Sequence, residues 1–76
     1  MSGMNASPTE SAIAPGWYVL RLGDYAVRIW RRGRKWDVMG MAPSGEIIAG
    51  PVRVSTLRRS RIIAAKWLAR RPTNGS

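Results

Sequence analysis

The segment RIWRRGRKW, residues 28–36, holds the residue types with the most evident chemistry in this chain. Around Gly33 it carries five cations and two tryptophans, namely Arg28, Arg31, Arg32, Arg34, Lys35, Trp30 and Trp36. Guanidinium groups bond phosphate oxygens and guanine edges, so the pattern favours a hairpin that binds nucleic acid. Two other interpretations are a membrane-seeking Arg/Trp segment and a fold element whose charges are only solvated.

The residues on which most enzymes and metal sites depend are missing. The chain has no histidine, the commonest general base and metal ligand, and no cysteine for a disulfide or a thiolate site. Its four carboxylates are scattered without visible pairing, at Glu10, Asp24, Asp37 and Glu46. The sequence also lacks a Gly-rich phosphate loop. We therefore expect no enzyme activity, no metal and no cofactor.

The charge balance points to a polyanionic partner. The chain has 13 Lys and Arg against 4 Asp and Glu, a formal net charge of +9. From Ile47 onward there is no acid, whereas the bases are Arg53, Arg58, Arg59, Arg61, Lys66, Arg70 and Arg71. A field of this sign attracts nucleic acid first, and an acidic protein or an anionic membrane second.

The length of 76 residues limits the chain to one domain. Residues 1–15 have few apolar side chains and no periodicity, which predicts a flexible tail. Residues 72–76, which begin with Pro72, are similar, so the domain is expected to span residues 16–71. No apolar run approaches the ~20 residues of a membrane span, and the first residues do not resemble a signal peptide. A cytoplasmic location follows as an expectation.

The middle of the chain predicts strands. Residues 17–22 are rich in β-formers, residues 25–32 alternate in polarity, and residues 35–41 form a return strand after a tight turn at Gly33. A short fourth strand at 46–49 would end at Gly50 and Pro51.

The last element is predicted to be an amphipathic helix, with Ser55 or Thr56 as its N-cap. Its apolar arc contains Leu57, Ala64 and Leu68, extended on one side by Ser60, Ile63 and Trp67. The fold class is therefore α+β, with a three- to four-stranded antiparallel sheet packed on one C-terminal helix. In the expected core, the sheet residues Tyr25, Val27, Ile29, Trp36 and Val38 meet Leu57, Ala64, Trp67 and Leu68.

If Val27 and Ile29 face the helix, the alternate residues of the same strand must face solvent, because the period of a strand is two. The predicted nucleic-acid-binding residues are Arg21, Arg28, Trp30, Arg32, Arg34, Lys35, Arg59 and Lys66. A two-stranded ribbon fits the major groove of DNA. The plainer alternative is that Lys and Arg are ordinary residues of an open sheet face, with Trp30 covering their aliphatic stems.

The order of three strands and a helix, with YAVRIWRRGRKWDV as the central hairpin, resembles a family of plant proteins, the DNA-binding domains of ethylene-response factors. It is also similar to the arm-binding domains of some phage and transposon integrases. The resemblance covers roughly residues 25–68 and rests on Val27, Arg28, Gly33, Lys35, Trp36, Val38, Gly45 and the helix. It implies that Arg28, Trp30, Arg32 and Lys35 read DNA from the sheet. The basic helix differs from the acidic helix of those families and favours a second phosphate-contacting face or another docking mode.

The partners expected from the sequence are therefore ranked. Duplex DNA bound by the exposed sheet face and the 28–36 hairpin comes first, with RNA left open. The alternative is a phage-type inhibitor or adaptor that binds an acidic host protein surface, by charge steering and edge-strand pairing. A membrane is the least favoured partner. A domain this small is also expected to bind specifically as a homodimer or within a larger assembly.

Overall fold

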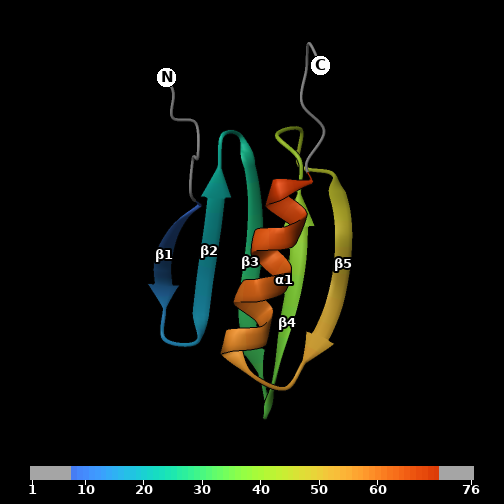
Figure 1. The fold of residues 1–76 in the computed structure, drawn as a ribbon. Coiled ribbons are helices and arrows are strands. Elements are labelled where there is room, and N and C mark those ends of the chain that lie inside the picture. Colours follow the sequence, from blue (N-terminus) through green and yellow to red (C-terminus); the bar gives the residue numbers. More distant parts are fainter. Residues whose placement is uncertain (1–7, 71–76) are drawn as a thin grey trace.

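The computed structural model describes residues 8–70 as one antiparallel sheet and one helix (Figure 1). The strands pair in chain order, and the helix lies across one face of the sheet, over its middle strands. The bounds are β1 Thr9–Ala14, β2 Trp17–Leu22, β3 Tyr25–Arg32, β4 Lys35–Met41, β5 Ile47–Val54 and α1 Leu57–Ala69. The α+β architecture is confirmed, but the sheet has five strands rather than three or four.

The central strands β2, β3 and β4 have the bounds that the sequence predicts. On β3, Val27 and Ile29 are 1% and 0% exposed under α1, whereas Arg28 between them is exposed on the opposite face. Gly33 in the β3–β4 turn has a φ of 64°, a conformation that glycine adopts without the steric penalty of a Cβ atom. Alternating polarity and a glycine turn thus determine this hairpin locally.

The strand β1 is a correction to the expected tail of residues 1–15. It pairs antiparallel with β2, placing Glu10 opposite Leu20. The Glu10 carboxylate accepts two 2.9 Å hydrogen bonds from the Arg61 side chain of α1, and this bond raises the pKa of the Arg61 guanidinium. All residues of β1 are exposed, which explains why no apolar pattern marks it. The rest of the two expected tails, residues 1–7 and 71–76, lies outside the described residues.

The strand β5 is longer than expected, because it continues through Gly50 and Pro51 instead of ending there. It is an edge strand, the position where a proline costs no ladder hydrogen bond on its outer side. The β4–β5 register shifts between Val38 and Gly40, as at a bulge. Gly50 has a φ of 80°, and a Cβ atom there would lie 2.5 Å from the Val38 carbonyl oxygen. Glycine at this position is therefore a steric requirement of the strand.

The helix α1 starts at the second of the two expected cap residues. The Thr56 hydroxyl accepts a 3.1 Å hydrogen bond from the backbone N–H of Arg59. This bond satisfies one of the amide groups that have no partner inside the first turn. Arg58 and Arg59 follow directly in that turn, which contains no acidic residue.

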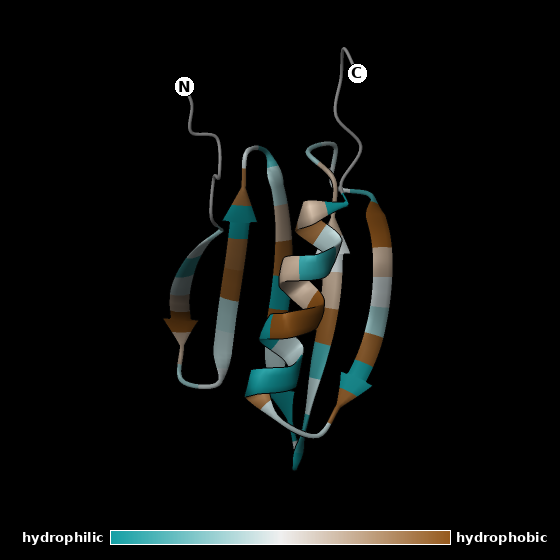
Figure 2. Cartoon of the chain, viewed as in Figure 1, coloured by the Kyte–Doolittle hydropathy of each residue, from teal (hydrophilic) through white to brown (hydrophobic). Residues whose placement is uncertain are grey.

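The core lies between α1 and the sheet, as the sequence predicts. Its buried members are Leu20, Val27, Ile29, Val38, Ala64 and Leu68, and its half-buried neighbours include Tyr25, Trp36, Leu57 and Trp67. The Trp36 ring lies 6.1 Å from the ring of Tyr18, centroid to centroid. Hydrophobic residues are visible on α1 and on the strands beneath it (Figure 2). Each large aliphatic side chain buried here stabilises the fold by about 1.5–3 kcal/mol.

The path of β5 generates a stability prediction. Gly50→Ala should lower the free energy of unfolding by roughly 2–4 kcal/mol. Alanine is strained at a positive φ, and its Cβ atom would also clash with the Val38 carbonyl oxygen. Gly45→Ala is the matched control, since Gly45 has a φ of 92° but no atom within 4 Å of an added Cβ; it should cost only about 1–2 kcal/mol. Urea unfolding measures both, and equal losses would contradict the described path of β5.

Candidate nucleic-acid interface

The sheet face opposite α1, called the open face here, is built from rows of residues that run across the strands. Directly paired residues of an antiparallel sheet project from the same face. One row joins Trp17, Trp30, Asp37 and Arg53, from β2 to β5. The next two rows consist of Val19, Arg28 and Met39, then Arg21, Ala26 and Met41. The open face therefore combines aromatic, thioether and guanidinium groups.

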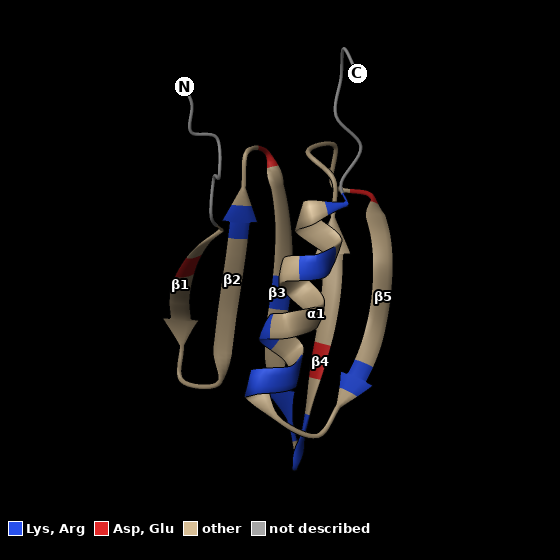
Figure 3. Cartoon of the chain, in the orientation of Figure 1, with Lys and Arg blue, Asp and Glu red and all other residues tan. Residues whose placement is uncertain are grey.

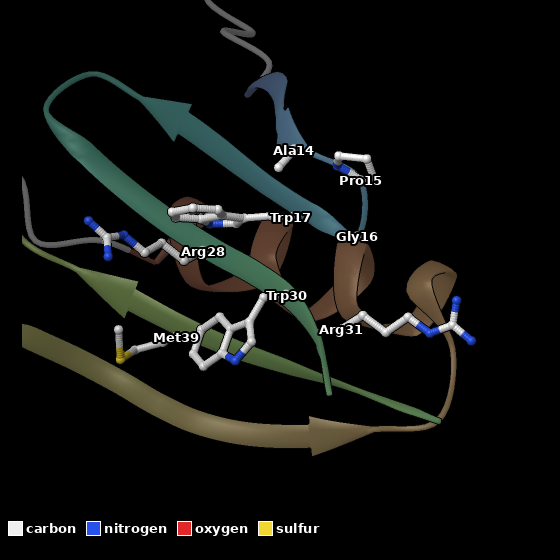
Figure 4. Close-up of a pocket in the computed structure, with 8 residues that line it drawn as sticks. All are labelled: Ala14, Pro15, Gly16, Trp17, Arg28, Trp30, Arg31 and Met39. Atoms are coloured by element: carbon white, nitrogen blue, oxygen red, sulfur yellow. The ribbon is translucent and has the colours of Figure 1, made fainter. Parts of the chain in front are cut away.

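A hollow on the open face lies between the two tryptophans. Figure 4 shows Trp17, Trp30, Arg28 and Met39 gathered on one side of the sheet, while Arg31 extends away from them. The hollow has a volume of about 500 Å³ and is also bordered by the end of β1 and the β1–β2 turn, residues 14–16. Trp17 is 39% exposed, an unusual condition for so large an apolar ring.

The cations of the open face differ in whether they are bonded to a carboxylate. Arg32 and Arg53 both bond Asp37, with an Nη1–Oδ2 distance of 3.4 Å and an Nε–Oδ1 distance of 3.2 Å. The Asp37 side chain is only 6% exposed, whereas the arginine side chains remain 65% and 56% exposed. Within residues 8–70, the Arg28 guanidinium has neither a hydrogen bond nor an ion pair. Arg28 therefore has its donors available to a ligand, as do Arg21 and Lys35 of the same face.

Charge is distributed unevenly along the length of the sheet (Figure 3). The β3–β4 turn, the last residues of β5 and the first turn of α1 share one end, called the basic end here. It contains Arg31, Arg32, Arg34, Lys35, Arg53, Arg58 and Arg59. Asp24 and Glu46 lie at the opposite end, in the connections before β3 and β5. The hollow between the tryptophans opens near the basic end, since Trp17 begins β2 and Trp30 is close to the end of β3.

The predicted site residues fall into two layers. Arg21, Arg28, Trp30, Arg32 and Lys35 share the open face, and Arg34 lies in the turn between β3 and β4. Arg59 and Lys66 are on α1, on the other side of the sheet, where they border a separate hollow beside Ile62 and Ile63. A ligand on the open face can reach the first set but not the second, because the sheet lies between them.

Three residues of the open face were not predicted as binding residues: Trp17, Met39 and Arg53. The signal for Trp17 was present, because Trp17, Val19 and Arg21 alternate with the helix-facing residues of β2. Arg53 gave no signal, since β5 was expected to end before it.

Other kinds of site are not evident in the part of the chain that the structure describes. Residues 8–70 contain no group of His, Cys, Asp or Glu that could hold a metal ion. Within the same range no helix has the length and apolarity that crossing a membrane requires. Comparison with models of protein families, with curated proteins and with solved structures finds no match. Inferences about function therefore rest on the geometry of the chain itself.

The Asp37 ion pairs generate a second prediction. Asp37→Asn should lower the free energy of unfolding by about 1 kcal/mol, because the two arginines lose a charged acceptor but are exposed enough to be solvated instead. Glu46→Gln is the control, since the exposed Glu46 side chain forms no ion pair within residues 8–70. Thermal melts of the two variants check this difference. A change of less than about 0.5 kcal/mol, the usual range for surface substitutions, would show that the ion pairs at Asp37 contribute nothing to stability.

Proposed function

We propose that this protein binds nucleic acid through the open face and the adjoining hairpin, residues 28–36. The observation that carries the proposal is the environment of Arg28. Its unpaired guanidinium lies in the row next to the paired Trp17 and Trp30 and borders the same hollow, on a face that α1 leaves uncovered. Trp17 is exposed and Trp30 is half-buried. Arginine beside accessible aromatic rings is a combination that proteins use to bind phosphates and bases together.

The basic end supplies the electrostatic part of the proposal. The β3–β4 turn carries Arg34, and Arg32 and Lys35 flank it as a pair on the open face. These side chains can follow a phosphate backbone while the neighbouring hollow receives other parts of the ligand. A net charge of +9 on so small a chain also accelerates the encounter with a polyanion.

The single carboxylate on the open face supports the same assignment. Asp37 would repel phosphate if its charge were free. Instead it is nearly buried and accepts hydrogen bonds from Arg32 and Arg53, whose outer atoms stay exposed. The local balance is therefore positive, with the negative charge held beneath two guanidinium groups.

An acidic protein surface is the second candidate partner, and strand β5 favours it. Ile47, Ile48 and Val52 are exposed by 57%, 41% and 38% on this outer strand. An open edge with apolar side chains can pair with a strand of another protein. In this alternative the positive charge steers an acidic partner instead of holding phosphates.

The function is tested by removing one cation from the open face and one from α1 and comparing the loss of affinity. Arg28→Ala should weaken binding of a labelled oligonucleotide by about tenfold, the loss of a contact of roughly 1–3 kcal/mol, without changing the melting temperature. Lys66→Ala on α1 removes the same formal charge and should weaken binding much less. Fluorescence anisotropy with duplex and single-stranded oligonucleotides, at several salt concentrations, measures these effects.

The salt dependence of the affinity shows whether a given side chain contacts a phosphate or only adds to the overall attraction between the protein and the nucleic acid. If five phosphates are bound, the slope of log affinity against log salt should be about −4.5 for a duplex and about −3.5 for a single strand. Arg28→Ala should flatten the slope by about one if Arg28 contacts phosphate. If Lys66→Ala and Arg59→Ala weaken binding while Arg28→Ala does not, α1 is the docking surface. If none of them alters binding, the acidic-protein alternative is the better one.

A further inference from the structure

The rings of Trp17 and Trp30 are available to a ligand. Within residues 8–70 the structure contains one pair of aromatic rings, Tyr18 with Trp36, and one cation over a ring, Arg61 over Tyr18. Neither open-face tryptophan takes part, and neither indole N–H donates a hydrogen bond within that range. A tryptophan that serves only packing has its ring surface covered, whereas Trp17 is 39% exposed and Trp30 is half-buried, so that each leaves part of its ring accessible.

The size of the sheet argues against duplex DNA as the ligand of this hollow. Strands in a sheet are about 4.8 Å apart, so five strands extend over about 19 Å between the outer strand axes. The major groove is about 12 Å wide. β1 and β5 flank the central strands on both sides, and they would meet the phosphate ridges before Trp17 or Trp30 reached a base edge. A narrow hairpin tip can enter a groove, but the tryptophans are on the broad face behind it.

An unpaired base fits the same features without this conflict. In single strands the face of each base is accessible, and its stacking on an aromatic side chain is insensitive to sequence. The hollow of about 500 Å³ is within the usual range for small-ligand sites, about 300–1,000 Å³. Arg28 and Met39 occupy the row next to the tryptophans, where they offer a charged donor and a polarisable apolar contact.

We infer that the hollow between Trp17 and Trp30 receives an unpaired nucleobase, so that the ligand of the open face is single-stranded nucleic acid. The inference rests on the proposed function and replaces the duplex DNA that the sequence favours. Trp30 and Trp17 stack bases, Arg28 binds an adjacent phosphate, and the basic end directs the strand across the sheet. DNA and RNA share this chemistry, because stacking needs only the base.

The test uses the full-length chain and three labelled ligands of equal length: a single-stranded 12-mer of thymidines, the matched duplex, and a 12-mer with the same phosphates but no bases. Anisotropy at two salt concentrations gives the affinities. The single strand should bind at least tenfold tighter than the duplex, and removal of the bases should cost about 5- to 150-fold per stacked base. Because this comparison uses the unaltered protein, its result does not depend on whether a variant folds.

Variants then locate the stacking. Trp17→Leu and Trp30→Leu should each weaken single-strand binding by about 5- to 150-fold and leave binding of the base-free strand unchanged. Trp30→Phe should retain part of the affinity because it keeps a ring. Ile62→Ala, at a 50% exposed apolar residue of α1, is the control and should change nothing.

The outcomes distinguish this inference from the proposed function. If the duplex and the base-free strand bind as tightly as the single strand, and Arg28→Ala weakens all three, the stacking inference is wrong while nucleic-acid binding stands. If none of the three ligands binds, both fail.

Discussion

The burial of Ile29 and Val38 beneath α1 is the constraint on which the open face depends. Both side chains are 0% exposed, and they are paired across β3 and β4. Because strand residues alternate between faces, a slip of one residue would carry Trp30 and Arg28 into the core and leave the aliphatic residues in water. The same packing that stabilises the domain thus also determines which residues a ligand meets.

Much of this fold can be predicted because it is encoded locally. The alternation of β3, the glycine turn at Gly33 and the Thr56 cap each depend on neighbours within a few residues. β1 cannot be found in this way: it buries nothing, and its Glu10 is bonded to Arg61, a partner 51 residues away. The sequence also does not reveal that β5 continues past residue 49, because Gly50 and Pro51 ordinarily end a strand. They are accommodated here because β5 is an edge strand.

The part of the candidate site that depends on local sequence pattern could also be predicted. Arg28, Trp30 and Arg32 share a face because the alternation of β3 specifies them, and the turn at Gly33 pairs Lys35 with Arg32. Trp17 was not assigned a face, although it lies four residues before Arg21 and a strand period of two puts both on the same face. Lys66 is separated from this group because α1 packs on the opposite face of the sheet. The charge pattern of the sequence does not reveal that separation.

The central claim is that the ligand lies on the open face, and the tryptophans offer a direct observation of it. An NMR titration with a single-stranded oligonucleotide follows four indole N–H signals in one spectrum, from Trp17, Trp30, Trp36 and Trp67. The first two are on the open face, whereas the last two pack around the core on the α1 side. We expect the Trp17 and Trp30 signals to move with saturation while those of Trp36 and Trp67 stay in place. Movement of Trp67 and of the α1 amides alone would contradict the account.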